Sequence, residues 1–274
     1  MRILMSSQAR PELRPYVRAY AQRVFEKDDP VVVESVPAMV EQILNLELGV
    51  MPGILHQGIE RLTDVALIGG VHSSFSGYLE LYPGVESFAV FFQPAGWSLL
   101  FKTPVFELTD RMFDGTGISG SGLRCLWNRM GEAYTFEARV QIVEEFLLRR
   151  ASSAAEHNKM ICAANCIFRQ HGALKISSLA SHYSLGLRQF ERAFERETGI
   201  SPKVFARIAR FQSALDAKLV SPQRTWIEIA HSFGYYDQMH MIHDFEKLGR
   251  AAPTELITQM GDVRPPALVS EENK

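Results

Sequence analysis

Two stretches with the same pattern lie in the C-terminal half of the chain. Residues 176–199 read ISSLASHYSLGLRQFERAFERETG, and residues 226–249 read WIEIAHSFGYYDQMHMIHDFEKLG. Each contains two amphipathic runs separated by a glycine, Gly186 or Gly234, which is typical of two short helices joined by a turn. This arrangement is the helix-turn-helix, whose second helix enters the DNA major groove. We therefore predict two helix-turn-helix units, at about 176–198 and 225–248.

The second helix of the first unit would read DNA. Gly186 is its candidate N-cap, and we expect its core-facing residues to be Leu187, Phe190, Ala193 and Phe194. The candidate DNA contacts on the opposite face are Arg188, Gln189, Glu191, Arg192 and Arg196. Arginine suits guanine N7 and O6, and glutamate suits cytosine N4–H; Arg196, further along, suits a phosphate. The structural alternative is a solvated face of Glu–Arg pairs at helical spacing.

The second unit repeats this arrangement with fewer charges. We expect its apolar positions to be Ile227, Ile229, Ala230, Phe233, Met241 and Phe245. Its candidate DNA contacts are Gln238, Met239 and His243, since glutamine pairs bidentately with adenine. A metal cluster of His231, His240 and His243 is the alternative, but no cysteine or carboxylate completes a clear site, so we expect no metal.

A single long helix is predicted between the two units. Gly199 ends the preceding helix, Ser201 would cap the next one, and Pro202 occupies its favoured first position. A helix over 202–219 would be about 27 Å long. Recognition helices that enter successive major grooves on one DNA face lie about 34 Å apart, so this helix is a plausible spacer.

The whole-chain composition is that of a globular protein with two domains. The 274 residues are 46% hydrophobic and carry a net charge of −2. Between Ala155 and Met260, 13 Lys and Arg face 10 Asp and Glu, against 16 and 21 elsewhere. A mildly basic half joined to an acidic half is compatible with a DNA reader attached to a sensor, although so small a difference also arises by chance. Three cysteines, no export signal and no long apolar run predict a cytoplasmic protein with reduced thiols.

The N-terminal half shows the pattern of short β-strands. Strand-like runs rich in β-branched and aromatic residues, separated by Pro or Gly, occupy residues 31–35, 40–48, 65–71, 77–82 and 87–93. Because no helices intervene, we predict an antiparallel sheet, cupin-like or a small barrel, and hence an α+β chain. Residues 10–20 are expected to form a short helix or turn. Helices are expected at 95–102, 106–113, 121–130, 134–149 and 158–171.

The polar run at 149–158 predicts the domain boundary. The expected parts are an N-terminal regulatory or dimerisation domain at 1–152, a DNA-binding domain at 156–261 and a disordered tail at 262–274. Cys162 and Cys166 lie one helical turn apart, and we interpret them as small buried residues and not as a redox pair.

An enzyme is the main rival function. Residues 115–120 match G-x-G-x-x-G, but no strand precedes them and no βαβ unit surrounds them, which favours a flexible loop over a dinucleotide site. There is no P-loop and no G-x-S-x-G, and no motif surrounds Cys125. We therefore expect no catalytic residues, no cofactor and no enzymatic activity. The alternative is a small-molecule-binding or catalytic β domain whose helical half mediates protein interaction.

The C-terminal half resembles the DNA-binding domain of AraC/XylS-type transcription regulators from about residue 159 to 260. The resemblance includes Arg188-x-Phe-x-Arg-x-Phe194, Gly199-Ile-Ser-Pro202, Phe233-Gly234-Tyr235, Asp237-Gln238 and Asp244-Phe245. It implies seven helices, two helix-turn-helix units, and base contacts from Arg188, Glu191, Arg192, Gln238, Met239 and His243.

Departures from the family pattern fall mainly in the second unit. The family usually has Arg where His243 stands and a basic residue where Glu246 stands, so we expect the second unit to bind DNA more weakly than the first. Residues 13–17, 92–94 and 107–110 of the N-terminal half loosely resemble the small β domain of some members. That resemblance implies a sensor or dimerisation role. The partners expected are double-stranded DNA, with RNA polymerase, a small-molecule effector and a second copy of the chain as candidates.

Overall fold

The computed structural model describes residues 3–50, 52–57, 60–62, 65–115, 121–152 and 159–260. Most of the predicted loop at 115–120, most of the predicted domain boundary at 149–158 and the predicted disordered tail at 262–274 lie outside the described residues.

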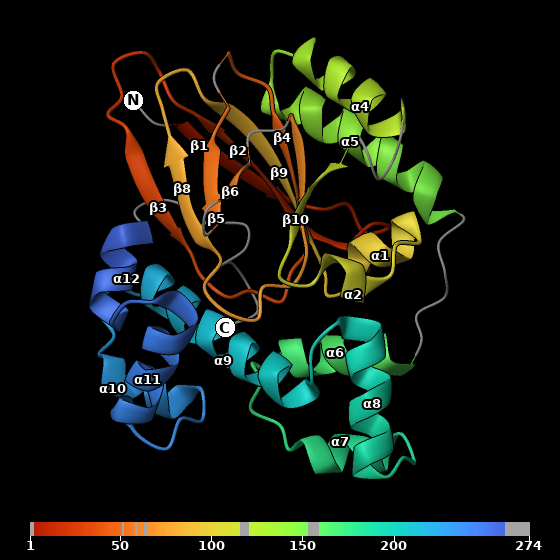
Figure 1. Ribbon diagram of the computed structural model, residues 1–274, viewed down its shortest axis with the longest axis vertical. Coiled ribbons are helices and arrows are strands. Elements are labelled where there is room, and N and C mark those ends of the chain that lie inside the picture. The colour runs from red at the N-terminus through yellow and green to blue at the C-terminus, as the bar shows by residue number, and fades with distance from the viewer. Residues whose placement is uncertain are drawn as a thin grey trace.

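The N-terminal half contains two antiparallel sheets, which confirms the predicted fold class (Figure 1). The larger sheet has the order β1 (Ile3–Gln8), β2 (Val17–Val24), β9 (Glu86–Phe92), β4 (Ile43–Glu47), β7 (Ala66–Gly69), β10 (Met112–Asp114). The smaller sheet has the order β3 (Val32–Val36), β8 (Gly77–Leu81), β5 (Ile54–Gln57), β6 (Glu60–Leu62).

The larger sheet is covered on both faces, and successive side chains of its strands point to opposite faces. Large residues at even positions, such as Leu44, Phe88 and Val90, pack against the N-terminal helices in one hydrophobic core. The odd positions point to the smaller sheet, and at the centre of β2 and β9 they are only Ala21 and Ala89. Small residues on this inner face leave room between the sheets.

Helices pack on the outer face of the larger sheet (Figure 1). They are α1 (Gly96–Phe101), α2 (Val105–Leu108), α4 (Ser121–Gly131) and α5 (Phe136–Ala151). The prediction of one helix over 106–113 is wrong, because α2 ends at Leu108 and residues 112–114 pair with β7 as β10. The prediction of a helix or turn over 10–20 is wrong from Val17 onward, where β2 begins. Pairing with two neighbouring strands overrides the local pattern there.

The C-terminal half is entirely helical within the described residues. Its helices are α6 (Lys159–Arg169), α7 (Ile176–His182), α8 (Leu187–Thr198), α9 (Pro202–Val220), α10 (Trp226–Ser232), α11 (Gln238–Gly249) and α12 (Pro253–Met260). The core contains six buried phenylalanines: Phe190, Phe194, Phe205, Phe211, Phe233 and Phe245. Figure 1 shows α7 and α8 at one end of α9, and α10 and α11 at the other.

Three burial predictions are wrong. Leu187 is 45% exposed and Ile227 is 55% exposed, because both lie in the first turn of a helix, beyond the edge of the core. Cys162 is exposed because α6 buries the face that carries Met160, Ala163 and Ile167 instead. No helix within the described ranges is both long and apolar enough to cross a membrane.

Candidate DNA-binding surface and interdomain cavity

The turn between α7 and α8 sets the direction of the first candidate recognition helix. Leu185 N donates to Ala180 O at 3.0 Å, and Gly186 is the N-cap of α8, as predicted. The Gln189 side chain reaches back, and its Oε1 accepts from Gly186 N at 3.3 Å. Beneath the turn, the ring of Tyr183 stacks on Phe190 at 6.3 Å. These contacts hold α8 by its buried face and leave the other face open.

The open face of α8 carries a row of arginines. Arg188, Arg192 and Arg196 follow one another at four-residue spacing, and all three are exposed. Glu191 beside them is half-buried, and Arg196 Nε pairs with Glu197 Oε1 at 3.1 Å. Gln189 is exposed, but the acceptor atom of its side chain already caps the helix, so its amide N–H is the group that remains to donate.

The second candidate recognition helix, α11, has positions equivalent to the arginine positions of α8, but the residues there carry less positive charge. Met239 and His243 occupy the second and sixth positions of α11, as Arg188 and Arg192 do in α8. Met239 is 58% exposed and His243 is exposed, whereas Gln238 is half-buried. His243 Nδ1 also lies 3.5 Å from Glu246 Oε2. The structure therefore brings the candidate contacts of each unit together on one exposed helix face.

The long helix α9 separates the two units. It has 19 residues, which corresponds to about 28 Å at about 1.5 Å per residue. Ser201 caps it and Pro202 begins it, as predicted. Its Phe205 packs edge-on against Phe194 of α8, and its Phe211 packs against Phe245 of α11. A displacement of α9 would therefore move both recognition helices.

No group of three or more His, Cys, Asp or Glu that could hold a metal ion occurs in the part of the chain that the structure describes. Of the three histidines of the alternative metal cluster, His240 packs its ring edge-on against Tyr235, with ring centroids 5.5 Å apart.

Buried polar contacts join α9 to the segment between β3 and β4. Gln212 Nε2 donates to Glu41 Oε2 at 2.6 Å, and Gln212 Oε1 accepts from Val40 N at 3.1 Å. Glu41 also pairs with Arg18 of β2. Gln212 and Glu41 are 2% and 1% exposed, so the loss of either partner would leave polar groups buried without hydrogen bonds.

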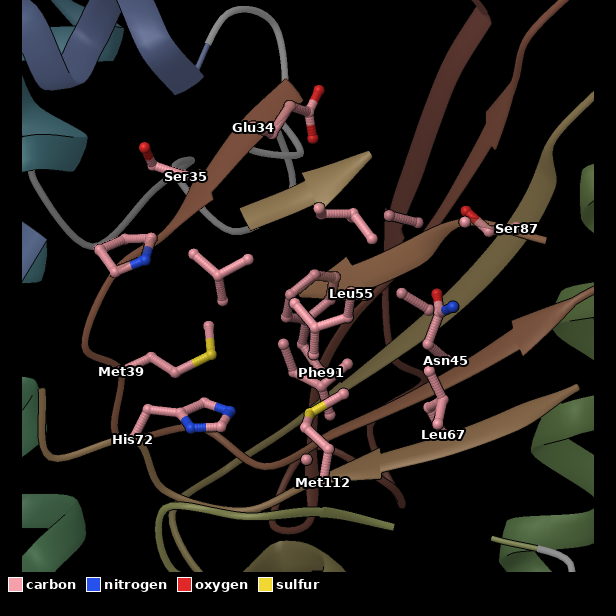
Figure 2. Close-up of a pocket in the computed structure, with 18 of the residues that line it drawn as sticks. Glu34, Ser35, Met39, Asn45, Leu55, Leu67, His72, Ser87, Phe91 and Met112 are labelled. Atoms are coloured by element: carbon pink, nitrogen blue, oxygen red, sulfur yellow. The ribbon is translucent and has the colours of Figure 1, made fainter. Parts of the chain in front are cut away.

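A cavity lies between the two sheets and extends to the helical half. Its volume is about 170 Å³, and most of its wall is apolar. Gln212 and Leu215 of α9 and Met260 of α12 complete the wall. Figure 2 shows Asn45 and Ser87 on one side of the cavity and Met39 and His72 on the opposite side. The wall of this cavity therefore contains residues of both halves.

The ionisable groups of the cavity wall are Glu34, Glu47 and His72, which are buried, and Arg23, which is half-buried. Arg23 NH1 lies 2.7 Å from Glu34 Oε2. Burial raises the pKa of Glu47 to about 7, although hydrogen bonds from Gly53 N and Asn45 Nδ2 partly oppose this rise. Burial lowers the pKa of His72 to about 4. At neutral pH, His72 is uncharged and Glu47 is near its midpoint.

The cavity and the contacts of Gln212 were not predicted from the sequence. The sequence does contain one pattern that points to the cavity: small or polar residues stand at odd-numbered positions of the strands, as in Ala21, Asn45, Ser87 and Ala89. That alternation predicts an inner face with little side-chain volume, but it does not predict which strands face each other.

Comparison with known proteins agrees with this architecture. The family profile described as "Helix-turn-helix domain" matches residues 179–259. A search of curated proteins finds no match. Among solved structures, ToxT from Vibrio cholerae O395 is 9% identical, with a TM-score of 0.50 over 95% of this chain and 99% of ToxT. An apo ToxT variant from Vibrio cholerae strain SCE256 is 8% identical, with a TM-score of 0.51 over 88% of this chain and 98% of that one.

The likeness to ToxT concerns the fold, and the match over residues 179–259 contains α8, α9, α10 and α11. These helices are the ones that carry the family's sequence pattern. Residues 179–259 therefore carry a helix-turn-helix domain, in agreement with the resemblance of this half of the chain to AraC/XylS-type transcription regulators.

Proposed function

We propose that the chain reads DNA with α8 and α11, one recognition helix in each of two successive major grooves. The base contacts would come from Arg188, Glu191 and Arg192 of the first unit, with Gln189 donating through its amide and Arg196 binding a phosphate. In the second unit, Gln238, Met239 and His243 would occupy the groove. One observation carries the proposal: α8 and α11 expose side chains at equivalent helix positions, and α9 separates the two helices.

The two helices would contribute unequally. The row in α8 has three guanidinium groups, whereas the corresponding row in α11 is Met239, His243 and Lys247. Phosphate neutralisation supplies much of the affinity for DNA, so α8 would anchor the protein and α11 would tune its specificity. An exposed methionine suits apolar contact with a thymine methyl group.

We further propose that the N-terminal half controls the reader through α9. The support is the buried contact of Gln212 with Glu41, together with the cavity wall that Leu215 and Met260 complete. An effector in the cavity that binds one placement of α9 more tightly than another would shift the relative positions of α8 and α11. No reaction is assigned to the chain.

Binding to DNA selected from a random-sequence pool tests the reader. Fluorescence anisotropy of the full chain should show that Arg188→Ala and Arg192→Ala each weaken binding by about 1–3 kcal/mol. The exposed Arg124→Ala on α4 is the matched control, with the same change of charge away from α8. Binding that is unchanged in both α8 variants and insensitive to salt would contradict the proposal.

A second experiment tests control by the N-terminal half. Binding sites are mapped across a genome with the full chain and with a chain that begins at residue 156. We expect the distribution of sites, or the expression of the nearby genes, to change when the N-terminal half is removed. Identical sites and identical transcription would rule out a controlling role.

A further inference from the structure

The interdomain cavity has an excess of acidic groups at one end. Arg23 of β2, Ser87 of β9 and Glu47 of β4 are direct cross-strand neighbours, so they form one row on the inner face of the larger sheet. Glu34 of the smaller sheet lies against Arg23, with 2.7 Å between Arg23 NH1 and Glu34 Oε2. Two carboxylates therefore share this end of the cavity with one guanidinium.

Glu47 has neutral hydrogen-bond donors but no ion pair among the described residues. Its carboxylate accepts from Asn45 Nδ2 at 2.5 Å and from Gly53 N at 3.3 Å. The side chain is 5% exposed, and the pKa of about 7 shows that these donors and the more distant Arg23 do not fully offset burial. A cation beside Glu47 would supply the missing opposite charge.

The rest of the cavity is suited to an apolar group. Beyond the polar row its wall contains Ala21, Ala89 and Leu55, and then Phe91 and Met112. An apolar cavity of about 150 Å³ is large enough to hold benzene. A cavity of about 170 Å³ therefore has room for one ring or a short alkyl chain.

We propose that this cavity binds a small, mainly apolar amine, whose ammonium group donates to the Glu47 carboxylate while its ring or chain lies against Ala89 and Leu55. Ser87 Oγ and Asn45 Oδ1 are further acceptors at the same end. A carboxylate ligand fits poorly, because it would meet Glu47 directly and could bind Arg23 only by competing with the buried Glu34. The proposal deepens the effector role proposed above and rests on it.

Three compounds of the same shape test the charge preference: benzylamine, benzyl alcohol and benzoate. Isothermal titration of the full chain should show benzylamine binding at least about tenfold more tightly than either of the others, since a hydrogen bond to a charged group exceeds a neutral one. Glu47→Gln should remove this preference and leave benzyl alcohol nearly unaffected. The matched control is Glu145→Gln, an exposed position on α5, which should leave all three affinities unchanged.

A second pair of variants locates the binding site. Ala89→Val narrows the cavity by two methyl groups and should weaken all three compounds, whereas Ala138→Val, a partly exposed position on α5, should not. Benzoate binding as tightly as benzylamine would overturn the proposal. So would an amine preference that survives Glu47→Gln, full binding by Ala89→Val, or no binding of any of the three compounds.

The same protein samples separate this proposal from the proposed DNA reader. DNA binding is measured without ligand, so normal DNA binding with no amine preference contradicts only the ligand class. Amine binding with no sequence-specific DNA binding contradicts the reader and leaves the cavity assignment standing.

Discussion

Glu47 and His72, which line the same cavity, should make the unfolding free energy of the protein depend on pH in opposite directions. Replacing each of them separately with glutamine should reveal these two dependences. Burial raises the pKa of Glu47 from 4.5 to about 7 and lowers the pKa of His72 from 6.5 to about 4. At about 1.36 kcal/mol per pH unit, each difference corresponds to about 3 kcal/mol of unfolding free energy.

The two contributions have opposite signs. Between pH 4.5 and 7, folded Glu47 keeps a proton that the unfolded chain releases, so its stabilising contribution is complete below pH 4.5 and lost as the pH rises to about 7. Folded His72 stays neutral where the unfolded chain binds a proton, so its contribution is complete above pH 6.5 and lost as the pH falls to about 4. Where the two windows overlap, these slopes nearly cancel in the wild-type protein.

Each variant removes one slope. We take the unfolding free energy of the wild-type protein and subtract that of the Glu47→Gln variant. This difference should fall by about 3 kcal/mol from pH 4 to pH 8. The same difference for His72→Gln should rise by about 3 kcal/mol from pH 4 to pH 7. Glu145→Gln is the control, because that exposed carboxylate should show no comparable change.

Urea denaturation at a series of pH values measures these differences. Trp97 and Trp127 lie in the N-terminal half, so in a Trp226→Phe background the tryptophan fluorescence follows that half alone. This separation matters because two-domain chains often unfold in more than one step. If the unfolding free energy has the same pH dependence in the wild-type protein and in both variants, the assignment of these two pKa values to burial is refuted.

The remaining predictions concern the reader and its contact with the sheets. Arg192→Ala should weaken DNA binding, measured by anisotropy, more than His243→Ala does; equal losses would contradict the proposed asymmetry of the two units. Gln212→Leu should lower the unfolding free energy by about 1–3 kcal/mol, measured by urea denaturation, because it removes a buried donor to Glu41; an unchanged midpoint would show that this contact is dispensable. Gly172→Ala should lower the unfolding free energy by more than about 1 kcal/mol in the same assay, since φ is +66° and the added Cβ would lie 1.9 Å from a carbonyl oxygen of α9. An unfolding free energy equal to that of the wild-type protein would contradict this backbone argument.

The β half shows where sequence reasoning was limited. Five strands were predicted close to their observed positions, because alternation and turn residues are local signals. The sequence did not predict β1, β5, β6 or β10, and the start of β2 was interpreted as a helix or turn, since these segments are strands only through pairing with partners elsewhere in the chain. Likewise, Leu187 and Ile227 fit an apolar helical period, yet their helices begin at the edge of the core and leave them exposed.

The sequence by itself determined the DNA-reading half of this protein. Helical periodicity, the turn glycines and the start at Ser201-Pro202 act over a few residues, so they specify α8, α9 and α11 without knowledge of the rest of the fold. The tertiary structure alone decided the cavity and its connection to α9. Arg23, Glu47 and Ser87 are far apart in the chain and become neighbours only through strand register, and Gln212 meets Glu41 only when the two halves pack together.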